Sequence, residues 1–190
     1  MNKIMSKIVF ANNPLDRMSS IRSDEEWQKT SMISSDARYI IFDSGKPLIQ
    51  VSKEPGSNSV IYLAKFDSIK KHFEACQIIF LGEMKTVKYY AIDITKERSL
   101  FDLEIFVGCK FIDLRSIAQS LSPEDTGILA QAKSMVEWNA VNIFCTRCEN
   151  SKLKTVDAGS KKLVINAKPN YSLAWTLSLS CCPFIMKNVF

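Results

Sequence analysis

A helix start near residue 122 limits the folds open to this chain more than any other feature of its sequence. Ser122 can accept hydrogen bonds from the N–H groups that a first helical turn leaves unpaired, and Pro123 suits the first helical position. The apolar residues that follow recur on one helical face: Ile128, Leu129, Ala132, Met135 and Val136. The pattern predicts a long amphipathic helix that packs on a sheet.

Before this helix, several short runs of residues with high β-strand propensity predict the strands of the sheet. We expect strands over residues 39–42, 47–51, 60–63, 77–82 and 87–94, the last two side by side. The turn residues Asp43-Ser44-Gly45 make a hairpin of the first two strands. Short helices are expected over residues 66–75 and within 10–33, the latter with Asp16 as its cap. Strands that are interspersed with short helices and followed by one long helix predict an α+β domain with a mixed or antiparallel sheet.

Charge and composition describe an ordinary globular chain. Of its 190 residues, 46% are hydrophobic and 24% charged, and the net charge is +5. The basic residues are scattered, and Lys161-Lys162 is only a pair, so we interpret them as solvated surface and expect no nucleic-acid partner.

Targeting signals are not apparent in this sequence. Residues 1–10 have no continuous apolar run, which argues against secretion, and cytoplasm is the default compartment. The apolar stretch 173–186 is too short for a membrane span of about 20 residues.

Two cysteines, Cys145 and Cys148, form a C-x-x-C pair directly after the long helix. Such a pair can grip one zinc ion, but a closed structural site needs four ligands, and residues 158–171 contain no Cys, His, Asp or Glu. The alternatives are a ribbon that folds without metal, a site completed by Cys181, Cys182 or a second chain, and a zinc- or redox-responsive thiol protein. Cys145 and Cys148 are the candidate metal ligands.

Several charged and aromatic residues are interpreted as structural. We expect Asp113 and Arg115 to form a local ion pair beside the long helix, and Arg22 to be a helix-surface charge. Trp27 and Trp138 are expected to anchor the core.

Several motifs together resemble a known family. One stretch resembles, in order and spacing, the junction between the Nudix-like N-terminal domain and the zinc ribbon of NADH pyrophosphatases. It consists of residues 111–116, 121–124 and 129–132, then Trp138, then Phe144 with the cysteine pair. Residues 13–17, 80–82 and 90–93 resemble upstream parts of the same family. The resemblance implies a Nudix-like domain over residues 1–138, a partial zinc-ribbon-like segment over 139–171 and an irregular tail over 172–190.

The family resemblance also implies an activity. Its members carry a catalytic Nudix domain that splits NAD(H) into NMN(H) and AMP with Mg²⁺ or Mn²⁺, are typically homodimers, and include peroxisomal and mitochondrial proteins. In this sequence none of the six glycines is followed six residues later by Glu, as the Nudix box requires. We therefore predict no catalytic residues and a non-catalytic structural or dimerisation module, paired with itself or with a full-length protomer. The alternative is a fragment of an active NAD⁺ diphosphatase whose catalytic domain is lost from the gene model.

The tail, residues 172–190, departs from the family pattern. Permitted codons for residues 172–178, read two bases later, encode Pro-Arg-Met-Asp-Pro-Val, which resembles the stretch that leads into the catalytic domain. We expect the tail to be an aberrant, frame-shifted apolar segment.

Overall fold

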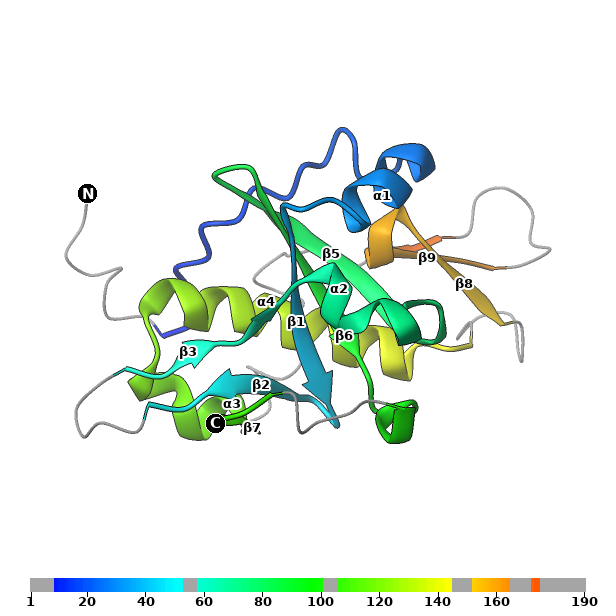
Figure 1. Ribbon diagram of the computed structural model, residues 1–190. Helices are drawn as coiled ribbons and strands as arrows, with labels where there is room; N and C mark the ends of the chain where they lie inside the picture. Colours follow the sequence, from blue (N-terminus) through cyan, green and yellow to red (C-terminus); the bar gives the residue numbers. More distant parts are fainter. Residues whose placement is uncertain (1–8, 53–57, 101–105, 145–151, 165–171, 175–190) are drawn as a thin grey trace, which may run out of the picture.

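A seven-stranded mixed sheet organises the chain in a computed structural model that describes residues 9–52, 58–100, 106–144, 152–164 and 172–174 (Figure 1). Its strands are β1 (Ala37–Asp43), β2 (Lys46–Gln50), β3 (Val60–Ile61), β4 (Leu63–Ala64), β5 (Gln77–Met84), β6 (Val87–Asp93) and β7 (Cys109–Phe111). The order along the sheet is β3-β2-β1-β6-β5, with β4 on β1 and β7 on β2. Only the β1–β6 pair is parallel among these contacts, so the predicted mixed α+β class is confirmed.

The long helix α4 (Pro123–Val141) covers one face of the sheet. All five residues of its predicted apolar face are buried there, against Ile40, Phe42 and Leu81 of the strands. The Ser122 hydroxyl accepts the backbone N–H of Asp125 at 3.0 Å, as expected for the cap. The helix continues three residues beyond the predicted boundary at Trp138, and Asn139 is buried.

The opposite face of the sheet is covered by α1 (Glu25–Met32) and α2 (Phe66–Ile69), and the 3₁₀ helix η2 (Lys70–Ala75) follows α2 directly. Alternate strand residues such as Tyr39, Ile41 and Phe80 point into this second cluster, because successive side chains of a strand face opposite sides. Shorter helical turns are η3 (Arg98–Leu100), α3 (Leu114–Ile117) and η5 (Ala118–Ser120).

The predicted hairpin between the first two strands is confirmed. Asp43 pairs with Lys46 across a two-residue turn, and Ser44 and Gly45 have φ values of 52° and 72°. Positive φ at both central positions is the geometry that matches the twist of paired strands. The predicted pairing of the 77–82 and 87–94 runs is also confirmed, as β5 and β6 lie antiparallel.

Two predicted elements differ in detail. The first helix starts at Glu25, and its cap is Asp24, whose carboxylate accepts the N–H groups of Glu26 and Trp27; Asp16 as the cap is therefore wrong. Asp16 instead exchanges two backbone hydrogen bonds with Glu83 at the edge of the sheet. The predicted strand 60–63 is split into β3 and β4 because the chain passes from a pairing with β2 to one with β1.

A second, three-stranded sheet follows α4. It consists of β8 (Leu153–Val156), β9 (Lys161–Val164) and β10 (Ser172–Ala174), in the order β10-β9-β8, and the 3₁₀ turn η6 (Asp157–Gly159) joins β8 to β9. We call β8, η6 and β9 the ribbon hairpin. Of the tail that we expected to be irregular, residues 172–174 are the strand β10, and residues 175–190 lie outside the described residues.

Tyr90 makes the stability of this fold sensitive to alkaline pH. Burial raises the pKa of Tyr90 to about 12, while its hydrogen bond with Ser31 lowers it and the carboxylate of Glu83 raises it. Because the folded-state pKa lies above the unfolded value of 10.0, the contribution is fully present below pH 10 and is lost as pH rises toward 12. The loss amounts to roughly 2 to 3 kcal/mol for this one group.

Replacing Tyr90 by Phe should therefore flatten the pH dependence. We expect urea unfolding at about pH 8 and pH 11 to show a smaller loss of unfolding free energy for Tyr90→Phe than for the original chain. The comparison between the two proteins cancels the titration of groups that do not interact with Tyr90; Tyr39, whose pKa is raised by burial and by Tyr90, is the exception. An equal loss of unfolding free energy in both proteins would show that burial does not raise the pKa of Tyr90.

Candidate functional site

Arg22 fixes the segment that leads into α1. Its side chain is 3% exposed, and its guanidinium donates to the carbonyl of Phe80 at 2.8 Å and to that of Arg17 at 3.1 Å. Gln28 donates in turn to the carbonyl of Arg22 at 2.6 Å. The prediction of a helix-surface charge at Arg22 is therefore wrong: the guanidinium is buried because it satisfies carbonyls of β5 and of the preceding loop.

Two further contacts seat α1 on the sheet. The Trp27 ring meets the Phe80 ring edge-on at 5.2 Å between centroids, and the hydroxyls of Ser31 and Tyr90 lie 2.8 Å apart. Trp27 packs on the core as predicted. Helix α1 is thus held on β5 and β6 by one guanidinium, one ring contact and one hydroxyl pair.

The ribbon hairpin is held by a buried lysine at the carboxyl end of α4. Lys162 is 3% exposed, and its ammonium group donates to the carbonyls of Asn139 at 2.8 Å and Asn142 at 2.6 Å. The Asn139 amide donates to the carbonyl of Gly159 at 2.9 Å. A cation at a helix C-terminus satisfies orphan carbonyls and favours the helix dipole. Burial lowers the pKa of Lys162.

The prediction that Lys161 and Lys162 are both solvated surface residues is therefore correct for Lys161 and wrong for Lys162. Lys161 is exposed, whereas the alternation of β9 turns Lys162 toward α4.

The turn of the ribbon hairpin sits against β5. Gly159 has φ +91°, and a Cβ added to it would lie 2.8 Å from Cγ2 of Ile79. Ala158 is buried in the same cluster as Phe80 and Tyr90. Glycine is needed at this turn for both its backbone conformation and its close approach to Ile79.

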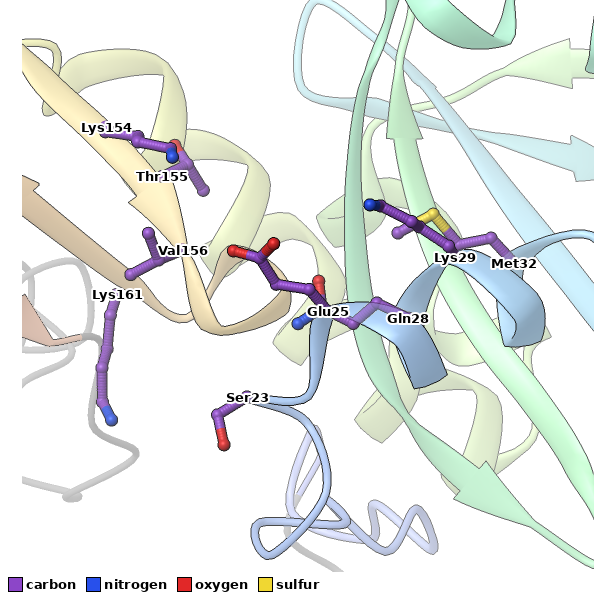
Figure 2. A pocket seen from close by; sticks show the side chains of 9 residues that line it. All are labelled: Ser23, Glu25, Gln28, Lys29, Met32, Lys154, Thr155, Val156 and Lys161. Carbon is purple, nitrogen blue, oxygen red and sulfur yellow. The ribbon is translucent and has the colours of Figure 1, made fainter.

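An open groove of about 350 Å³ lies between α1 and the ribbon hairpin (Figure 2). The α1 side contributes Ser23, Glu25, Gln28, Lys29 and Met32. The hairpin side contributes Lys154, Thr155, Val156 and Lys161. We call this feature the α1–hairpin groove.

The register of the hairpin explains the charge of the groove. Val156 pairs with Lys161, so these two side chains and that of Lys154 share the face opposite to Lys162. Among the described residues, three lysines and a single carboxylate, Glu25, line the groove. Hydroxyl, amide and ammonium donors outnumber acceptors, which is an arrangement suited to holding an anion.

The lysines of the groove were not predicted as a site. The turn sequence Asp157-Ala158-Gly159 between two lysine-bearing runs is the one local signal for a hairpin with Lys154 and Lys161 on one face. The sequence alone carries no signal that α1 lies opposite.

The predicted metal ligands Cys145 and Cys148 lie outside the described residues, and zinc binding stays a prediction. Within the described residues, no three His, Cys, Asp or Glu side chains come together as a metal-binding group. Cys76 and Cys109 are half-buried free thiols there, and burial, with Glu97 and Asp93, raises the pKa of Cys76 to about 11. Nor does any described helix have the length and apolar character to cross a membrane.

Two smaller predictions are corrected by the structure. Asp113 caps α3 by accepting the backbone N–H of Arg115 at 2.9 Å, and no ion pair joins their side chains among the described contacts. Trp138 is half-buried and lies under the ammonium group of Lys162, 5.6 Å from the ring centroid, outside the two core clusters of described residues.

The fold is an α+β domain with a mixed sheet, followed by a small three-stranded sheet. Residues 36–138, more than half of the chain, match the family described as the NADH pyrophosphatase-like rudimentary NUDIX domain. The chain belongs to this family.

Two curated relatives are similar to the chain over most of its length. One is the NAD-capped RNA hydrolase of Schizosaccharomyces pombe, 25% identical over 182 residues, which covers 82% of this chain and 48% of the relative. The other is the human NAD-capped RNA hydrolase NUDT12, 25% identical over 185 residues, covering 82% of this chain and 40% of the relative. The chain spans less than half the length of these relatives.

Removing the ammonium group of Lys162 should release the ribbon hairpin. Lys162→Met keeps an unbranched apolar stem of similar length but leaves the carbonyls of Asn139 and Asn142 without this donor, a loss of about 1 to 3 kcal/mol. We expect faster amide hydrogen exchange in residues 153–164 and little change in β1 or β6. Lys161→Met, the same change at the exposed neighbour, is the matched control. Unchanged hairpin protection in Lys162→Met would contradict the assigned role.

Proposed function

We propose that this chain is a non-catalytic structural module of the NADH pyrophosphatase type, whose role is to pair with a second copy or with a full-length protomer. The observation that carries the proposal is the buried connection between α4 and the ribbon hairpin, through Lys162, Asn139 and Gly159. It makes the rudimentary Nudix domain and the hairpin one body. A partner chain would meet a preformed surface and lose little conformational freedom on binding it.

The carboxylates of α4 have structural roles, which supports the absence of catalysis. Asp125 lies in the first turn, where burial raises its pKa while the Ser122 hydroxyl lowers it and Glu124 raises it. Glu137 pairs with Lys133, which also donates to the carbonyl of Gly45 at 2.9 Å. These acids stabilise the helix and the neighbouring hairpin turn. Hydrolysis of a pyrophosphate assisted by metal ions needs carboxylates that converge on those ions.

The end of α4 offers a surface for pairing. Val141 is 78% exposed and Phe144 50% exposed, and Ile143 between them is also exposed. Neighbouring exposed apolar side chains of this kind mark association surfaces more often than isolated ones do.

The activity of the isolated chain is the direct test. Purified protein is incubated with NADH and Mg²⁺ or Mn²⁺, and separately with NAD-capped RNA, the substrate named for both relatives. We expect no AMP, no NMNH and no decapped RNA, with a folded circular dichroism spectrum and a dimer in light scattering. Val141→Asp, at the exposed end of α4, should shift the dimer toward monomer, whereas Val107→Asp, at a similarly exposed position outside α4, should not.

Turnover that follows the protein through a final sizing column would overturn the non-catalytic assignment. A folded monomer at all concentrations would overturn the pairing role, provided that mixing with a full-length protomer gives no complex.

The alternative is that the chain is part of an active NAD⁺ diphosphatase whose catalytic domain is missing from this sequence. The coverage of less than half of both relatives favours it. Sequencing of the transcript decides: we expect a reading frame shifted by two bases after Tyr171 to encode a Nudix box downstream. A transcript without such a frame removes this alternative.

A further inference from the structure

Both walls of the α1–hairpin groove are attached to neighbouring residues of β5. The α1 wall is held by the hydrogen bond from Arg22 to the carbonyl of Phe80. The hairpin wall is held by the close approach of Gly159 to Ile79. Because Ile79 and Phe80 are consecutive in one strand, the distance between the walls is set by the sheet. The groove is therefore preformed, unlike a gap between two loops.

The lining of the groove is rich in cationic and neutral hydrogen-bond donors. Figure 2 shows Lys29 and Lys154 on opposite walls, with the carboxylate of Glu25 between them. Lys161 also lines the hairpin wall, and Ser23 adds a hydroxyl on the α1 side. Among the described lining residues Glu25 is the single carboxylate beside these lysines, and this excess of positive charge attracts an anion.

The chemistry and size of the groove favour a phosphate group on a small molecule. Lysine binds phosphate as a point charge, and hydroxyls can donate to the remaining oxygens. The volume of about 350 Å³ lies at the small end of the range for ligand sites. In the part of the chain that the structure describes, no aromatic side chain lines the groove to offer the stacking surface on which proteins bind single-stranded nucleic acid.

We propose that the α1–hairpin groove is a binding site for a small phosphomonoester, with Lys29 and Lys154 holding the phosphate from opposite walls. Glu25 weakens binding by repulsion and thereby keeps the site selective for ligands with enough negative charge to outweigh it. The site lies outside residues 36–138, which match the family, and it requires no catalysis by the chain. It goes beyond the proposed function and does not depend on it.

The test is a titration of the full chain, labelled with ¹⁵N, at constant ionic strength. Inorganic phosphate, AMP and adenosine are added separately, and amide shifts are followed in α1 and in β8 and β9. We expect saturable shifts at both walls with phosphate and AMP and none with adenosine. Binding by AMP and adenosine but not by phosphate would assign the site to the nucleoside and would overturn the phosphate as the recognised group.

Variants that each remove one charge distinguish binding of phosphate in the groove from non-specific electrostatic attraction to the protein surface. Lys154→Gln should weaken binding about three- to tenfold. Lys152→Gln removes the same charge from an exposed position two residues away that does not line the groove, and should change binding less than twofold. Glu25→Gln should strengthen binding. All three positions are exposed, so the variants are expected to stay folded, and the unperturbed amide spectrum of β1 checks this.

Equal weakening by Lys152→Gln and Lys154→Gln, or no saturable shift with any phosphate-bearing probe, would overturn the proposal. The hydrolysis assay is read independently, because an inactive chain can bind a phosphomonoester and an active chain can fail to bind one here.

Discussion

Four consecutive residues of β5 hold four different parts of the molecule, and the rest of the structure depends on this short stretch. Ile79 receives the turn of the ribbon hairpin at Gly159, and the Phe80 carbonyl accepts from Arg22. The Leu81 carbonyl accepts from Gln131 of α4 at 2.8 Å. Gly82 approaches the backbone of Asp16 so closely that a Cβ would lie 2.4 Å from the Asp16 carbonyl oxygen. The register of β5 against β6 shifts between Phe80 and Gly82, and such a bulge leaves backbone groups for partners outside the sheet.

The sequence predicted the parts of the fold that local chemistry determines. The hairpin at Ser44-Gly45 and the start of α4 at Ser122 depend on a few neighbouring residues. The first helix shows the limit, because Asp16 is the cap expected from the sequence and the structure has Asp24 there. Asp24 is the cap, because the backbone of Asp16 is already hydrogen-bonded to that of Glu83. That contact joins residues far apart in the sequence.

The buried polar side chains could not be predicted for the same reason. Arg22, Gln131 and Lys162 look like surface residues in sequence, and each is buried only because a carbonyl of a distant segment lies within reach. The family could be inferred from the sequence, since its motifs lie along the chain in order. The α1–hairpin groove could not be, since its walls come from segments on either side of the whole sheet domain.

Polar connections of this kind specify one arrangement more strictly than apolar contacts would. An apolar surface tolerates sliding, whereas a buried ammonium or guanidinium group that leaves its carbonyls loses the whole interaction and its desolvation is uncompensated. In this chain the donors Arg22, Gln131 and Lys162 each bind a carbonyl on another element, and two of those carbonyls are adjacent in β5. Movement of β5 at the bulge would therefore disturb α1 and α4 together. A partner or ligand that contacts α1 and the hairpin would act on this shared strand, so its binding free energy would add to the stability of the whole domain.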